Sequence, residues 1–596
     1  MVYKKLEYDG LKMIITLSKY YIETKIGLTK LQKYRKKMKE FFEKRGSKTA
    51  TPEQLTVICD EWYIESRNKW NGYTKFYIPE LSATSDGIKG GDNYKLVCEP
   101  STNTYKGRDD YAGNPLFIPT DCNWEMTDDG EPLITSIEGI DCLNTFTRND
   151  PNKFVGVLQM TGYHWWNTPN KNDSKYLYEG YCSEKISNAE IISRIQDATL
   201  INIAPLPEAV INENADVSGR ILLENSVANV RSWVCHSKYE PNLTSNNALT
   251  SYSGSPVISG SISLTSIHTY ANNTSAAHGQ SYTYSGHTMC DTSFLILMYR
   301  IKYASLASKD HLAGCGAYQY AYTAAVAESN TSRVILTAAN AENIEIGSTV
   351  RIGSSATRND AAAYSISGIN GYVVTGKVPV GSNVAIVVDN GTRSFSTTTT
   401  TYLHTHTWRT GVTDNILGND GSPTNPLSGK EPVKLQGIEY MNGVFVIAAD
   451  IINNYTTTES TPYFVRRVSQ QSESVTNNYI SSNTPYKLGG GYITYMYFNG
   501  GNSGLYFPYR PNSSSSISID IPAGSSSIYT KNNYATSSDT SGAHELELYL
   551  GGIFTTSLDQ AGLCYESSYD GVTTAAYHLG TRLSCNGNRG VYNINQ

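Results

Sequence analysis

The chain has 596 residues, which is too long for one compact core and predicts about three or four domains. Hydrophobic residues make up 39% of the chain and charged residues 17%, which excludes disorder driven by charge and favours polar, uncharged surfaces. The start of the chain lacks the apolar core and cleavage site of a signal peptide, and no window reaches ~18 apolar residues. We therefore expect neither a secretion signal nor a membrane span.

Tyrosine is the most unusual component, with 45 residues against 13 phenylalanines. A phenol ring is favoured over a phenyl ring where aromatic surface is half wet, as at interfaces with ligands or other subunits. Together with abundant Ser, Thr, Asn and Gly, this composition indicates a β-rich, loop-rich protein with a surface suited to the outside of the cell.

The net charge of −6 hides an asymmetry between the N-terminal region and the remainder of the chain. Residues 1–75 hold 17 basic and 9 acidic residues, a balance of +8, which leaves −14 for the rest. Such a region is compatible with a nucleic-acid or acidic partner, but a solvated helical face explains it more simply. We do not predict a nucleic-acid partner.

The ten cysteines are scattered without any C-x-x-C pair, so a zinc site is not expected. They look like free buried thiols of a protein folded in a reducing cytoplasm. A surface-type composition made without a secretion signal is typical of a virion component released by lysis. The cysteines are Cys59, Cys98, Cys122, Cys142, Cys182, Cys235, Cys290, Cys315, Cys564 and Cys585.

Residues 1–75 are predicted to be helical. The pattern of residues 11–46 predicts two helical pieces broken near Gly27, and Thr51 followed by Pro52 predicts the N-cap and first residue of another helix. We interpret this region as an attachment or oligomerisation region. A small helical subdomain that packs on the following residues is the alternative.

Residues 76–205 are predicted to form a β-rich domain, because short strand patterns alternate with turn signals. Residues 153–163 are the strongest strand candidate, and residues 187–198 predict a short amphipathic helix. Trp165 and Trp166 follow the strand and point to opposite sides, so at most one of them joins a platform for sugar stacking; packing in the core is the commoner role.

The third part, residues 216–585, contains a central helix and two interruptions. Residues 292–305 predict a helix that is apolar on nearly every face and is capped by Asp291 or Thr292. Residues 331–400 alternate apolar and polar positions between Asn/Gly turns, which predicts a small inserted β module. Residues 452–487 are rich in Asn, Thr and Ser and predict a surface arm.

Near the carboxyl end, residues 551–585 alternate two kinds of position. Glycine and apolar positions look like a scaffold with short buried strands, and the residues between them have the Tyr/Ser/Thr/Asp composition of a binding surface. The scaffold positions are Gly551, Gly552, Ala561, Gly562, Leu563, Leu579, Gly580, Arg582 and Leu583.

This pattern of GG, AGL, an aromatic and G-x-R-L resembles the end of phage tail and tropism-determinant proteins. Those proteins carry a C-type-lectin-like domain of the formylglycine-generating-enzyme type, and some are diversified by retroelements. The resemblance implies an α+β, β-rich, multidomain protein whose lectin-like domain covers residues 216–585. In diversified relatives the variable positions derive from adenine-rich codons, and Gln560 and Glu566 do not fit that set.

The resemblance implies that the chain binds a host cell-surface receptor, protein or glycan, as part of a phage tail fibre or tip. It further implies a homotrimer that contacts other tail proteins and is located in the virion. A structural virion protein, with its Tyr-rich surface buried between subunits, is the alternative. The residues expected to contact the receptor are Phe554, Thr555, Thr556, Leu558, Asp559, Tyr565, Ser568, Tyr569, Asp570, Tyr577 and His578.

Catalysis and metal binding receive less support from the residues. The enzyme that gives the fold its name uses a reactive cysteine pair, but Cys564 and Cys585 lack its flanking pattern, so we do not predict an enzyme. His404 and His406 face one side of a strand, so a divalent-ion site there stays an open alternative, although no third ligand is identified. The acidic loop 414–420 supplies oxygen ligands that suit calcium, but its residues do not have the spacing of a twelve-residue calcium-binding loop. No cofactor is predicted.

Overall fold

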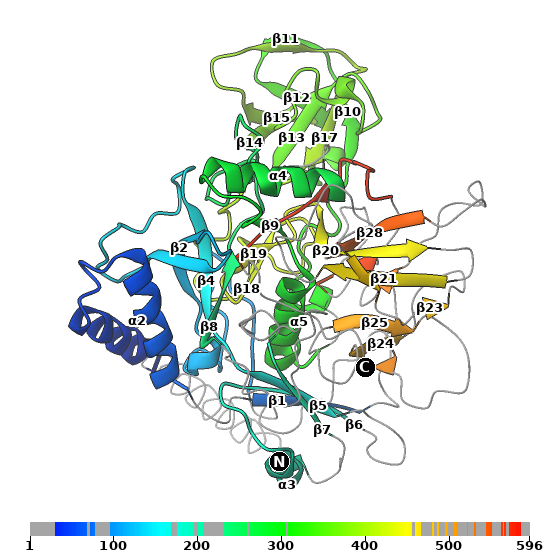
Figure 1. Cartoon of the computed structure of the whole chain (residues 1–596). Helices are drawn as coiled ribbons and strands as arrows, with labels where there is room; N and C mark the ends of the chain where they lie inside the picture. Colours follow the sequence, from blue (N-terminus) through cyan, green and yellow to red (C-terminus); the bar gives the residue numbers. More distant parts are fainter. Residues whose placement is uncertain are drawn as a thin grey trace, which may run out of the picture.

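The chain folds into a mixed α+β structure that is rich in strands (Figure 1). No helix in the described part of the chain is long and apolar enough to cross a membrane. The computed structural model describes residues 30–67, 72–77, 96–167, 176–195, 201–206, 231–258, 262–305, 308–455, 459–465, 479–481, 486–487, 495–498, 506–510, 521–522, 530–531, 544–550, 562–563, 566–567 and 571–585.

Two helices open the described chain. The first covers residues 30–44, and α2 covers Pro52–Glu65. The Thr51 side chain accepts a hydrogen bond from the Gln54 backbone N–H and the Gln54 side chain bonds back, a capping box that confirms the predicted N-cap. Trp62 of α2 packs against Tyr34, 5.1 Å between ring centroids, and thereby joins the two helices. Residues 11–29 of the predicted helical stretch lie outside the described residues.

The first sheet lies beside these helices and has the order β3-β2-β4-β8. A Cβ at Gly156 would lie 2.5 Å from the Cys235 Sγ and 2.7 Å from the Trp124 ring, so only glycine fits there. Beside this glycine, the Cys235 Sγ lies 3.7 Å from the Cys122 Sγ. The strands are β2 (Thr120–Met126), β3 (Pro132–Ile137), β4 (Phe154–Met160) and β8 (Trp233–Ser237).

A second antiparallel sheet has the order β1-β6-β5-β7 and is accompanied by the predicted short helix, here α3 (Asn188–Ile195). Its strand β5 contains both neighbouring tryptophans, and Trp165 and Trp166 are 0% and 2% exposed. The interpretation of either ring as a sugar-stacking platform is therefore wrong, because both are core residues. The strands are β1 (Gly72–Tyr77), β5 (Tyr163–Asn167), β6 (Tyr176–Cys182) and β7 (Ile201–Pro205).

Helix α5 (Met289–Tyr303) lies at the centre, between these sheets and the C-terminal strands (Figure 1). Every one of its residues is buried, as its all-round apolar pattern predicts. Its N-cap is Thr288, so the predicted cap at Asp291 or Thr292 is wrong. Asp291 instead occupies the third helical position and completes a capping box with Thr288, which moves the start of the helix toward the N-terminus. Helix α4 covers Leu264–Ala277.

The inserted β module stands out from the rest of the molecule (Figure 1). It is a six-stranded antiparallel sheet in the order β10-β17-β13-β14-β15-β12, and its core contains Val334, Ile352, Ile386 and Leu403. Its strands are β10 (Ala321–Thr323), β12 (Arg333–Thr337), β13 (Thr349–Gly353), β14 (Tyr372–Val380), β15 (Asn383–Asp389) and β17 (Tyr402–His406). The short strands β11 (Glu328–Thr331) and β16 (Phe395–Thr397) and the helix α6 (Ala338–Ala341) complete it.

The described C-terminal strands form an eight-stranded sheet around β20 (Phe445–Tyr455). Its other members are β21 (Glu459–Val465), β22 (Tyr479–Ser481), β23 (Tyr486–Lys487), β27 (Thr530–Lys531), β28 (His544–Leu550), β29 (Glu566–Ser567) and β30 (Leu579–Gly580). Smaller pairings join β9 (Ser285–Gly286) to β31 (Leu583–Ser584), β18 (Val433–Leu435) to β19 (Ile438–Tyr440), and β24 (Tyr495–Phe498) to β25 (Tyr506–Arg510) and β26 (Ile521–Pro522).

The cysteines of the described residues all carry free thiols. All of them are buried except Cys142, which is half-buried. This confirms the prediction of free thiols for nine of the ten, while Cys564 lies outside the described residues.

Candidate functional site

The scaffold positions near the carboxyl end are buried wherever the structure describes them. Leu563 is 3% exposed, and its backbone N–H donates a hydrogen bond to the Ser308 Oγ at 2.6 Å. Leu579 and Gly580 form β30, which runs parallel to β20, and Leu583 lies in β31, which pairs with β9. A Cβ at Gly580 would lie 2.5 Å from a Val444 methyl group, so the close approach requires glycine. Gly551, Gly552 and Ala561 lie outside the described residues.

Arg582 ties this C-terminal segment to two distant elements. Its guanidinium donates to the Ser237 carbonyl at 3.0 Å and to the Glu439 carbonyl, and it lies 3.9 Å from the Glu240 carboxylate. Burial raises the pKa of Glu240 to about 7, and Arg582 opposes that shift. Burial also lowers the pKa of Arg582. The arginine therefore joins β31, the end of β8 and the hairpin β18–β19 inside the core.

A second polar cluster lies at the N-terminal end of α5, next to the C-terminal segment that contains Arg582. The Asp450 carboxylate accepts the Met289 backbone N–H at 3.0 Å, and the His236 Nδ1 lies 3.1 Å from the Asp291 Oδ1. Burial raises the pKa of Asp450 to about 8. The His287 backbone N–H donates a hydrogen bond to the Thr581 hydroxyl at 3.4 Å, so the cluster contacts the C-terminal segment directly.

Two of the predicted receptor-contacting residues, Tyr577 and His578, lie in the described part of the chain, and both are half-buried. The Tyr577 backbone N–H donates to the Asn359 side chain at 3.0 Å, and the Tyr577 hydroxyl accepts a hydrogen bond from Gln319. Its ring centroid lies 5.7 Å from the Arg358 guanidinium. Tyr577 therefore contacts the inserted module.

The His578 ring packs on Phe445, with the centroids 5.8 Å apart. Its carbonyl accepts the Phe445 N–H at 2.7 Å, which fixes the segment to the start of β20. The other predicted contact residues lie outside the described residues: Phe554, Thr555, Thr556, Leu558, Asp559, Tyr565, Ser568, Tyr569 and Asp570.

The loop between the module and the hairpin β18–β19 is held by two buried carboxylates, of which the sequence singled out Asp420 as an oxygen ligand but did not single out Glu439. Glu439 accepts hydrogen bonds from the Gly411 N–H at 3.1 Å, the Thr413 N–H at 3.0 Å and the Thr413 hydroxyl at 2.7 Å. Asp420 lies 2.5 Å from the Lys302 Nζ. A lysine inside the apolar pattern of α5 was the available signal, because a buried lysine requires a carboxylate partner.

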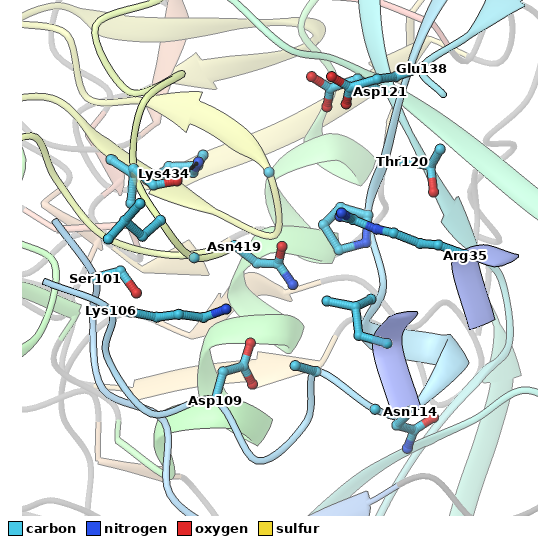
Figure 2. A pocket seen from close by; sticks show the side chains of 18 of the residues that line it. Arg35, Ser101, Lys106, Asp109, Asn114, Thr120, Asp121, Glu138, Asn419 and Lys434 are labelled. Carbon is cyan, nitrogen blue, oxygen red and sulfur yellow. Dashed lines mark hydrogen bonds between the residues drawn. The ribbon is translucent and has the colours of Figure 1, made fainter. Parts of the chain in front are cut away.

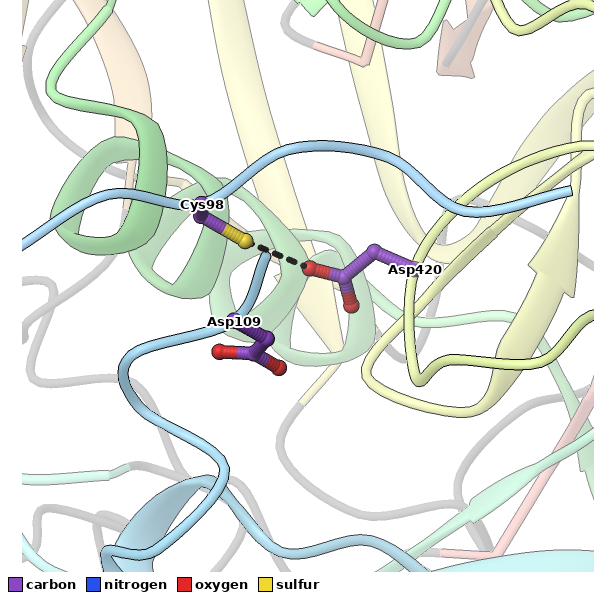
Figure 3. A group of neighbouring side chains, drawn as sticks. All are labelled: Cys98, Asp109 and Asp420. Atoms are coloured by element: carbon purple, nitrogen blue, oxygen red, sulfur yellow. Dashed lines mark hydrogen bonds between the residues drawn. The ribbon is translucent and has the colours of Figure 1, made fainter. Parts of the chain in front are cut away.

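Cys98, Asp109 and Asp420 offer three ligand atoms within 4.8 Å of one another (Figure 3). Their arrangement is explained without a metal, since the Lys302 Nζ lies 2.5 Å from Asp420 and 3.4 Å from Asp109. Burial raises the pKa of the Cys98 thiol, which donates a hydrogen bond to Asp420 at 3.4 Å. The cation of this cluster is the lysine.

His404 and His406 lie on β17 and are both buried. The His404 Nε2 lies 2.9 Å from the Ser355 carbonyl, and burial lowers the pKa of His404 to about 4. Arg351 and Arg358 line the same small space, and their positive charge disfavours a divalent ion there.

No protein-family model matches this chain, and no curated protein matches it. What the chain can do is therefore inferred from the residues and their geometry. Between the buried Leu563 and the buried Leu579, the described residues Thr573 and Ala575 are exposed.

Proposed function

We propose that this chain is a phage tail protein, located in a fibre or tip of the virion, that recognises a host cell-surface receptor. The contact surface is formed by the residues between Phe554 and His578. The observation that supports the proposal is a pair of buried anchors, Leu563 and Leu579, on either side of a segment rich in Tyr, Ser, Thr and Asp. Recognition surfaces are commonly carried on segments that a rigid scaffold positions.

The anchors are fixed by independent contacts, which makes the segment between them suitable for variation. Leu563 is bonded to Ser308, the strand at Leu579 pairs with β20, and Arg582 is bonded to Ser237 and Glu439. These contacts involve no side chain between Leu563 and Leu579, so we expect substitutions there to leave them in place. A homotrimer presents three copies of the surface, so modest affinity at each copy suffices through avidity.

Adsorption of virions that carry Tyr569→Ala and Tyr577→Ala tests the proposal. We expect adsorption to fall by roughly 100-fold or more, since aromatic contact residues contribute about 2 kcal/mol or more each at the centre of an interface. Tyr105→Ala is the matched control, because Tyr105 is 53% exposed and lies on a distant loop.

Because Tyr577 also contacts the inserted module, the thermal unfolding midpoint of the double variant is measured in parallel. A folded double variant that adsorbs as well as the wild type refutes the proposal. A double variant that fails to enter virions at all instead supports the structural alternative, in which this surface is a subunit interface.

A further inference from the structure

A cavity of about 900 Å³ lies between helix 30–44, the loop 96–119 and the loop 414–419 (Figure 2). Its size falls in the range of small-molecule sites, which extends over roughly 300 to 1,000 Å³. None of its lining residues belongs to the C-terminal segment 562–585. It is therefore a site separate from the proposed receptor surface.

The wall formed by residues 414–421 is held rigidly. The Asp420 carboxylate accepts the Gln436 N–H at 2.8 Å and pairs with Lys302, while the Asp420 carbonyl accepts the Ser101 N–H at 2.9 Å. A Cβ at Gly418 would lie 2.3 Å from the Ser101 Oγ, so the two loops touch. Because this wall is already ordered, ligand binding does not lose conformational entropy in ordering it, and this favours binding.

The acidic groups of the cavity all form ion pairs within the protein. Each carboxylate that lines it lies within ion-pair distance of a lysine or arginine. These pairs are Lys302–Asp109 at 3.4 Å, Arg108–Asp110 at 2.7 Å, Arg148–Asp121 at 2.8 Å, Arg148–Glu138 at 2.6 Å and Lys238–Asp414 at 3.5 Å.

Four cations of the lining remain beyond these pairs, namely Lys30, Arg35, Lys106 and Lys434, and none of them forms an ion pair with a carboxylate of the described residues. Arg35, Lys106 and the Asn419 amide point toward one another across the cavity from three different elements (Figure 2). Figure 2 also shows the Asp109 carboxylate near Lys106, and this carboxylate pairs with Lys302 at 3.4 Å. The lining thus carries more positive than negative charge.

Lys434 is the buried member of this set, at 6% exposure. Its Nζ donates to the Ile416 carbonyl at 3.4 Å, a long contact that leaves most of its hydrogen-bonding capacity unused within the described residues. Burial and the neighbouring Lys238 lower the pKa of Lys434 to about 8. A buried ammonium held this way is stabilised by an anion that enters the cavity.

We propose that this cavity binds a small organic anion, one that carries a carboxylate or phosphate on a hydroxylated body, as a uronic acid or a sugar phosphate does. The anionic group lies among Arg35, Lys106 and Lys434, and the Asn419 amide and Ser101 hydroxyl face the hydroxylated body. The apolar wall at Ile416 contacts the carbon skeleton.

Isothermal titration calorimetry of the full chain with glucuronate, glucose 6-phosphate, inorganic phosphate and glucose tests the proposal. We expect both sugar anions to bind, and neutral glucose to show no heat. Tighter binding of glucose 6-phosphate than of inorganic phosphate supports recognition of the sugar body, and equal binding overturns that part. Absence of binding by all three anions overturns the proposal as a whole.

Lys106→Met and Lys48→Met form a matched pair of variants, because both lysines are exposed and only Lys106 lines the cavity. We expect Lys106→Met to weaken binding of glucuronate or glucose 6-phosphate about tenfold, as the loss of one charge-assisted hydrogen bond implies. Lys48→Met retains wild-type affinity. Equal affinity of the two variants would mean that anions bind elsewhere.

Lys434→Met tests the buried cation, with the thermal unfolding midpoint as the control for folding. We expect binding of both sugar anions to be lost while the unfolding transition remains cooperative, since methionine has a similar volume and no charge to desolvate. Wild-type binding by a folded Lys434→Met variant contradicts the proposal.

Discussion

The apolar core of the inserted module and the core of the body around α5 are stabilised in different ways. The module has a core of aliphatic side chains on alternating strand positions, such as Val334, Ile386 and Leu403. In the body, Lys302 and Asp450 are buried beside the apolar residues of the same core. Apolar burial tolerates changes of shape and is indifferent to pH, whereas a buried charge depends on one partner and on its protonation state. The two regions are therefore expected to respond differently to the same kinds of substitution.

The largest effect is expected for Lys302→Met in the body. The substitution leaves Asp109 and Asp420 buried without their shared cation, and we expect a loss of roughly 3–5 kcal/mol in the free energy of unfolding. Urea unfolding measures it. Lys36→Met is the control, because Lys36 is 78% exposed in its pair with Glu40 and its loss costs less than about 0.5 kcal/mol. Equal losses in the two variants would mean that the buried ion pair contributes no more to stability than the exposed one.

Leu403→Ala probes the apolar core of the module. We expect a loss of about 2–5 kcal/mol from the lost burial and the cavity, with the same value at pH 6 and pH 8. Val378→Ala, on the same sheet but 46% exposed, is the control with a much smaller loss. Urea unfolding at both pH values provides the measurement. A loss that changes with pH would show that the module also depends on a titrating group.

Asp450→Asn tests whether the stability of the body depends on pH through one buried carboxyl group. The folded pKa of Asp450 is raised to about 8 by burial, above the value of 3.8 for an unperturbed aspartate. The wild type therefore takes up a proton at Asp450 on folding. The contribution of this protonated group to the free energy of unfolding is complete below about pH 4 and is lost as the pH rises toward 8.

The variant lacks this titration, so the wild type should lose up to about 1.4 kcal/mol per pH unit relative to Asp450→Asn across that window. Asp389→Asn, at an exposed position of the module, should run parallel to the wild type. Urea unfolding between pH 5 and 8 gives the slopes. Parallel curves for wild type and Asp450→Asn would mean that Asp450 is ionised in the folded chain.

Local signals in the sequence predicted local structure. Thr51 and Pro52 predicted the start of α2, and the apolar pattern of residues 292–305 predicted a fully buried helix. The predicted cap, Asp291 or Thr292, is wrong because Thr288 and Asp291 form a capping box in which Thr288 is the N-cap and Asp291 the third helical residue.

Long-range features escaped prediction for a physical reason. Lys302 meets Asp109 and Asp420 across separations of more than a hundred residues, and nothing in the neighbourhood of any of the three identifies its partner. The same holds for the cavity, where Arg35, Lys106 and Lys434 come from three distant segments. For the scaffold near the carboxyl end, a spacing motif in one short stretch indicated which positions are buried, such as Leu563 and Leu583.

The glycine at position 156 has a consequence for the redox behaviour of the protein. Cys122 and Cys235 lie on β2 and β8, on either side of β4, so two strand spacings, or roughly 9 Å, separate the two strands. A disulfide requires Cα atoms within about 7 Å, and joining these thiols would push β4 out of the sheet. Their sulfur atoms touch over Gly156 at 3.7 Å and yet remain unlinked. Transfer from a reducing to an oxidising medium is therefore not expected to link Cys122 to Cys235.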